Sequence, residues 1–107
     1  MSKQWDGLTI EGELKVGVWY AGQRHKKFTL RVPMSGDFIA AQETYPEGVL
    51  QLITLEVYRR QLLALGDIPE HVITTDLLRE NLAEVDLGVL SKADAELEKK
   101  LQVPSAE

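Results

Sequence analysis

The spacing of hydrophobic positions changes at Pro33. Before it, from Leu8 to Val32, apolar and polar residues alternate, which predicts an antiparallel β-hairpin over about 8–33. After it, apolar residues recur with helical spacing and predict helices near 36–44, 47–65, 75–83 and 87–101. The pattern therefore predicts an α+β fold, in which an N-terminal antiparallel β-hairpin is followed by about four α-helices and the helix near 47–65 is central.

The loop of the hairpin can be predicted by matching the apolar faces of its strands. A three-residue loop near 21–23 pairs Val16 with Phe28 and keeps one face apolar, whereas a two-residue loop would set Val18 opposite His25. We therefore expect the three-residue loop.

Capping residues indicate where the helices begin. Ser35 is expected to be the N-cap of the first helix, with Asp37 in the first turn, where the helix dipole favours an anion. Thr74 or Thr75 can cap the third helix and Asp86 the fourth. The helix start at 35–37 could also hold an anionic ligand, but the charge of Asp37 would repel it, so capping is the preferred interpretation.

Length and composition indicate one globular domain, 1–107. The 107 residues are 44% hydrophobic and 27% charged, which is compatible with a packed core. Within it we expect the hairpin at about 8–33, a helical part at about 35–102 and flexible termini. No apolar run reaches the ~20 residues of a membrane span, and we expect a cytoplasmic protein.

Charge is distributed unevenly along the chain. The formal net charge is −5, yet residues 24–32 carry four basic residues and no acid, which leaves −9 on the rest. Phosphate neutralisation supplies most of the affinity of nucleic-acid binders, so DNA or RNA is not an expected partner. The basic stretch is interpreted either as a solvated strand face or as a partner-binding patch.

Candidates for catalytic chemistry are few. The two histidines, His25 and His71, have no close companions with metal-ligand spacing, and no cysteine is present. No phosphate-binding or nucleophile motif occurs, and the carboxylates of Asp94, Glu96 and Glu98 fit the solvated face of a helix. We therefore expect no catalytic residues, no metal, no cofactor and no enzymatic activity.

Two apolar features are candidates for partner binding. The last predicted helix carries a stripe that could dock on its own domain, on a second copy of the chain or on a client helix; the stripe consists of Leu87, Leu90, Leu97 and Leu101. Trp19 lies on the strand face opposite Val18, where it either packs under a helix or serves as an exposed interface anchor.

Four stretches of the chain carry a resemblance to a known family. They are KKFTLRVPMSGDF, the Tyr-Pro-Glu-Gly step at 45–48, LEVYRRQLLALGDIP at 55–69 and TTDLLRENLAEVDLGVLSKADAELEKK at 74–100. With these motifs the chain resembles the phage tail assembly chaperones of the Mu-like type. The resemblance implies a non-enzymatic protein of the host cytoplasm, absent from the mature virion. It implies binding to the tape measure protein, which is kept soluble, and assistance to the tail tube protein during assembly.

Two other classes of protein remain compatible with the sequence. A structural tail component, such as a tail terminator or baseplate protein, would use similar strands but persist in the virion. A small phage regulatory protein that binds a host factor would share the acidic charge and the lack of catalytic motifs.

Overall fold

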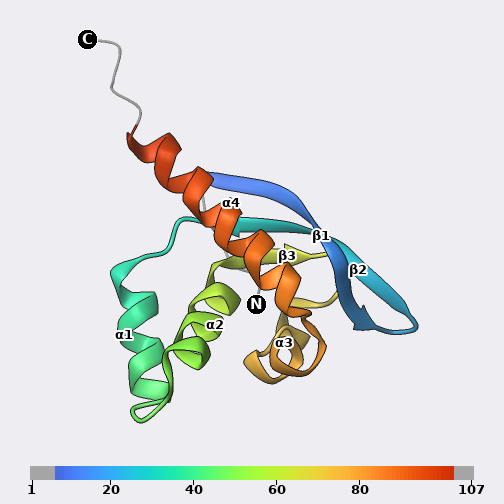
Figure 1. The fold of residues 1–107 in the computed structure, drawn as a ribbon, viewed down its shortest axis with the longest axis horizontal. Helices are drawn as coiled ribbons and strands as arrows, with labels where there is room; N and C mark the ends of the chain where they lie inside the picture. The colour runs from blue at the N-terminus through green and yellow to red at the C-terminus, as the bar shows by residue number, and fades with distance from the viewer. Residues whose placement is uncertain (1–6, 103–107) are drawn as a thin grey trace.

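The computed structural model describes residues 7–102 (Figure 1). Its elements follow the order β1 (Thr9–Tyr20), β2 (Gln23–Arg31), α1 (Ser35–Thr44), α2 (Leu50–Gln61), β3 (Leu62–Leu65), a 3-10 turn (Glu70–Val72), α3 (Thr75–Asn81) and α4 (Glu84–Gln102). The predicted α+β class, with an N-terminal hairpin and four α-helices, is confirmed.

The three strands form one antiparallel sheet in the order β1-β2-β3. Helix α4 packs mainly on β1, whereas α1 packs on α2 and α2 on α3 (Figure 1). The main core lies between the sheet and the helices, and its most buried side chains include Val18, Leu30, Leu62, Leu65, Leu78, Leu90 and Leu97. A second, smaller core joins α1 to α2 through Ala41, Ile53 and Val57.

The hairpin loop differs from the prediction. Tyr20 pairs with Gln23, so the loop has two residues, and both of them have positive φ (Ala21 53°, Gly22 81°), as in the mirror-image turns that suit hairpin twist. The predicted three-residue loop and its pairing of Val16 with Phe28 are wrong. Face matching failed because it assumed an uninterrupted strand.

Val18 does lie opposite His25, but an irregularity in β1 restores the pairing of apolar residues further from the loop. Glu13 pairs with Lys27 and Val18 with His25, so residues 14–17 of β1 lie opposite Lys26 alone. The bulge shifts the register, and beyond it Ile10 pairs with Leu30.

The central helix is shorter than predicted. Helix α2 ends at Gln61, and residues 62–65, predicted as its last turn, form strand β3 instead. Leu62 pairs with Leu30 and Leu65 with Phe28, so the free edge of β2 offers backbone hydrogen bonds and burial to this apolar run. A run of four apolar residues fits a strand or a buried helix equally well, and the tertiary partner decides.

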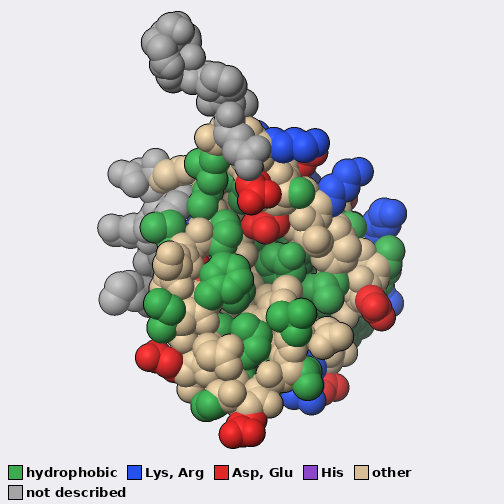
Figure 2. Space-filling view, turned by 60° about the vertical axis from the view of Figure 1, so that its left-hand side comes forward, with side chains coloured by type: hydrophobic (Ala, Val, Ile, Leu, Met, Phe, Trp, Pro, Cys, Tyr) green, Lys and Arg blue, Asp and Glu red, His purple; other side chains and the backbone are tan. Residues whose placement is uncertain are grey.

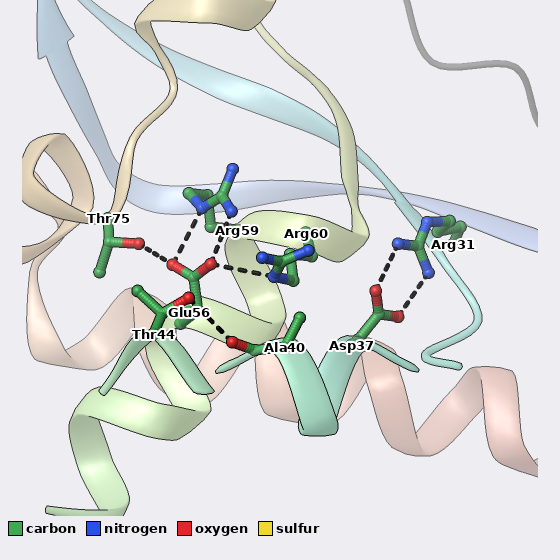
Figure 3. A network of polar contacts seen from close by, with 8 residues as sticks. All are labelled: Arg31, Asp37, Ala40, Thr44, Glu56, Arg59, Arg60 and Thr75. Atoms are coloured by element: carbon green, nitrogen blue, oxygen red, sulfur yellow. Dashed lines mark hydrogen bonds and ion pairs between the residues drawn. The ribbon is translucent and has the colours of Figure 1, made fainter. Parts of the chain in front are cut away.

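The start of α1 corrects the role of Ser35. The N-cap is Met34, and Ser35 is an exposed helical residue. The buried carboxylate of Asp37 reaches back and accepts from the Met34 backbone N–H at 2.7 Å. It also receives two hydrogen bonds from Arg31, at 2.7 and 2.8 Å (Figure 3). Asp37 therefore stabilises the first turn of α1 and links this helix to β2.

Candidate docking groove

An apolar groove of about 510 Å³ lies between α2, α3 and the start of α4. Leu78 is buried at its base, and four half-buried leucines extend the apolar lining: Leu52, Leu55, Leu82 and Leu87. Val49 stands at the rim with 65% of its surface exposed. Gln51, Arg79 and Glu84 complete the lining. An open groove with apolar walls from three helices has the form in which proteins bind an amphipathic helix.

A polar clamp holds α3 beside α2; we use this name for Glu56, Arg59, Arg60 and Thr75. Glu56 is buried and accepts from Arg59 at 3.0 and 2.6 Å, from Arg60 at 2.9 Å and from the Thr75 hydroxyl (Figure 3). Burial alone would raise the pKa of Glu56, but these hydrogen bonds and the charges of both arginines lower it below its ordinary value. The ionised carboxylate thus fixes two walls of the groove.

The third wall is fixed by Asp86. This residue was predicted to cap the last helix, but α4 begins earlier, at Glu84, and the fully buried Asp86 carboxylate accepts from the bulge of β1 instead. It receives the backbone N–H groups of Lys15 at 2.7 Å, Val16 at 3.0 Å and Gly17 at 2.9 Å. Asp86 therefore supplies the hydrogen bonds that the strand ladder does not give these residues, and it anchors the start of α4 on the sheet.

The cap predicted at Thr74 is confirmed. Its hydroxyl accepts from the Leu77 N–H at 3.1 Å and begins α3. The alternative cap, Thr75, instead belongs to the polar clamp.

The predicted partner-binding residues do not form one surface. Leu87 lines the groove, but Leu90 and Leu97 are 1% and 0% exposed in the core and are unavailable to a partner in this fold. Leu101 is exposed, yet it lies 14 residues from Leu87, about 21 Å along α4 at 1.5 Å per residue. Trp19 is 52% exposed on the hairpin, as in the interface-anchor interpretation.

Sequence reasoning missed most of the groove, notably Val49, Leu52, Leu55, Leu78 and Leu82. A signal was present, because the stretch around α2 is apolar around much of the helix circumference, more than one core-facing stripe requires.

A second exposed apolar surface lies on α1. We call it the α1 face; it consists of Met34, Phe38 and Ile39, which are 50 to 60% exposed. Figure 2 shows hydrophobic side chains gathered over this part of the molecule, with acidic and basic side chains mainly towards its margins. Unlike the groove, the α1 face is an outer helix surface.

The basic stretch does not form a uniform patch. Arg31 is occupied by Asp37, whereas Arg24, Lys26 and Lys27 border a shallow hollow of about 640 Å³ that also contains acids, Glu11 and Glu13. Although this hollow is larger than the groove, its mixed charge and exposed polar lining make it the weaker candidate site.

The two histidines differ in their burial. His25 is buried, its Nδ1 accepts from the Asp67 N–H at 3.1 Å, and its Nε2 lies 3.1 Å from the Tyr20 carbonyl oxygen. His71 is exposed in the 3-10 turn. Within 7–102, no group of three His, Asp or Glu side chains is placed to hold a metal ion. None of the helices in this range combines the length and the apolar composition that a membrane span requires.

No protein-family model matches this sequence, and comparison with curated proteins and with solved structures also gives no match.

Proposed function

We propose that this protein is a non-enzymatic phage tail assembly chaperone that binds a hydrophobic helical segment of the tape measure protein and keeps it soluble in the host cytoplasm. The observation that carries the proposal is the leucine-lined groove between α2, α3 and α4. The resemblance of the sequence to Mu-like tail assembly chaperones supports the choice of client.

The groove suits such a client on physical grounds. Its half-buried leucines can cover the apolar stripe of a helix at positions i, i+3, i+4 and i+7. The polar clamp and Asp86 hold all three walls without the client, so binding requires little ordering of the chaperone. The acidic exterior, with a net charge of −5, favours solubility of the complex.

The proposal moves the docking surface from the α4 stripe to the groove. Of the leucines in the α4 stripe, only Leu87 lines the groove. The α1 face lies outside the groove lining. Assistance to the tail tube protein is proposed from the resemblance alone.

Co-expression with the tape measure protein tests the proposal. The unmodified chaperone should hold the client in the soluble fraction, and Val49→Asp should lose this effect because it places a charge on the groove rim. Val49 is the N-cap of α2, where aspartate is a favoured residue, so the fold should tolerate the change. Leu50→Asp is the matched control, because Leu50 is 76% exposed and lies outside the groove lining.

Two results would count against the proposal. If the unmodified protein leaves the tape measure protein insoluble and binds none of its segments, the chaperone function is wrong. If mass spectrometry finds the protein in purified virions at the stoichiometry of a tail component, the structural alternative is favoured.

A further inference from the structure

The walls of the groove differ in charge. Helix α2 and its N-cap supply uncharged residues to the lining: Val49, Gln51, Leu52 and Leu55. The walls formed by α3 and α4 supply one base and one acid, Arg79 and Glu84. Arg79 lies in the last turn of α3 and Glu84 in the first turn of α4. The groove therefore presents two opposite charges beside its leucines, and both stand across from the uncharged wall of α2.

Neither charge of the lining is neutralised within the part of the chain that the structure describes. Arg79 and Glu84 are both exposed, and within 7–102 no ion pair joins them to each other or to a third side chain. A partner that covers the groove must either leave these charges in water or bring opposite charges to them, because an unpaired charge is costly to bury. The lining thus constrains the charges of its occupant as well as its apolar surface.

The exposed apolar surfaces elsewhere on the chain do not match this lining. Helix α1, which carries most of the α1 face, contains acids but no base. Trp19 has the guanidinium carbon of Arg24 5.6 Å from its ring centre and so presents a base. The exposed Leu101 does not extend an exposed stripe of α4, since Leu97, one turn earlier, is buried. A second copy of the chain is therefore not the expected occupant of the groove.

We propose that the groove prefers an amphipathic helix of another protein that carries one acid and one base beside its apolar stripe, with the acid facing Arg79 and the base facing Glu84. This inference rests on the proposed function and specifies the chemistry of the client segment. A helix in which the acid and the base exchange places would bring like charges together, which costs affinity. Arg79 and Glu84 thus determine specificity, whereas the leucines supply apolar contacts that both helices share.

Pairs of synthetic helical peptides with identical composition test the inference. Each peptide carries leucines at i, i+3, i+4 and i+7, and the two members of a pair differ only in that a glutamate and a lysine beside this stripe exchange places. The series places these two residues one, two or three helical turns apart. Fluorescence anisotropy with the full chain measures the dissociation constants. At low salt we expect one member of the best-matched pair to bind about fivefold more tightly, and high salt to reduce this difference.

Exchange of the groove charges is the decisive measurement. Arg79→Glu combined with Glu84→Arg keeps the net charge and the leucines, and this variant should prefer the other member of the pair. Arg79→Gln combined with Glu84→Gln should bind both members equally, and circular dichroism checks that both variants fold. The matched control is Lys92→Glu combined with Glu98→Lys, which exchanges two exposed charges of α4 outside the lining and should keep the original preference.

The possible failures separate this inference from the proposed function. Equal binding of both members at every spacing, or a preference that survives the exchange or removal of the groove charges, would overturn the inference and leave the proposed function standing. If no peptide binds although co-expression keeps the tape measure protein soluble, the inference alone is wrong; if both measurements fail, both are wrong. A sedimentation coefficient that rises with protein concentration in the unmodified protein but not in Val49→Asp would overturn the inference in favour of a second copy in the groove.

Discussion

The Asp86 carboxylate of α4 accepts a hydrogen bond from the backbone N–H of Gly17, 69 residues earlier in β1, at 2.9 Å. Both groups are buried, and the same carboxylate holds the N–H groups of Lys15 and Val16. One side chain thus links the bulge that twists the hairpin to the start of the helix that walls the groove.

Asp86→Ala should lower the free energy of unfolding by about 3 kcal/mol, because it leaves one buried and two partly buried backbone N–H groups without this acceptor. Urea unfolding followed by circular dichroism measures the change. Glu84→Ala is the control: it removes an exposed carboxylate from the same first turn and should cost less than about 1 kcal/mol. Equal losses for the two variants would show that Asp86 acts only through the helix dipole.

The start of α1 gives a second contrast. Ser35→Ala should change stability by no more than about 0.5 kcal/mol, because Ser35 is exposed and forms no cap hydrogen bond. Asp37→Ala should cost about 2–4 kcal/mol, because it leaves the guanidinium of Arg31, whose side chain is 13% exposed, without its carboxylate partner. Thermal unfolding of both variants checks the order, and a larger loss for Ser35→Ala would restore the cap predicted from sequence.

Protonation of Asp37 and Glu56 should lower the stability of the fold in acid. Burial would raise the pKa of Asp37, but its bonds with Arg31 and the Met34 N–H lower it below the ordinary 3.8; the pKa of Glu56 is likewise below 4.5. With lowered pKa values the folded state binds fewer protons than the unfolded chain. The stabilisation is therefore present above these ordinary values and lost as the pH falls below them through the folded-state values.

Denaturant unfolding between neutral and acid pH measures this loss. Asp37→Asn should be less stable at neutral pH and show a shallower decline in acid than the unmodified protein. Glu96→Gln alters an exposed carboxylate and should keep the original slope. If Asp37→Asn lost stability with falling pH as steeply as the unmodified protein, the role given to Asp37 would be contradicted.

Substitution by alanine should affect stability in opposite ways at two glycines, Gly66 and Gly36. A Cβ at Gly66 would lie 2.5 Å from the Cβ and Nδ1 of His25, and the φ of +56° disfavours any side chain, so Gly66→Ala should cost at least about 2 kcal/mol. Gly36, in the first turn of α1, has open space at this position, and Gly36→Ala should be neutral or stabilise by up to about 1 kcal/mol. Chemical denaturation of both variants compares them; a tolerated Gly66→Ala would show that His25 moves freely.

Features that rest on neighbours in the chain were determined by the sequence itself. The change of period at Pro33 separates the hairpin of β1 and β2 from helix α1, and the cap at Thr74 joins residues only three apart. Period and capping involve the nearest few residues, so their energetics can be read without the fold.

Features that rest on distant partners were decided only by the tertiary structure. Residues 62–65 form a strand because β2 has a free edge to pair with. Asp86 does not cap α4, because its carboxylate accepts from three backbone N–H groups in the bulge of β1. The apolar stripe of α4 was visible in the sequence, but not which leucines the sheet would cover. Leu97 is buried in the main core while Leu101 is exposed, and the groove exists only where three helices meet. The hydrophobic effect is non-directional, so an apolar side chain does not specify which surface will cover it.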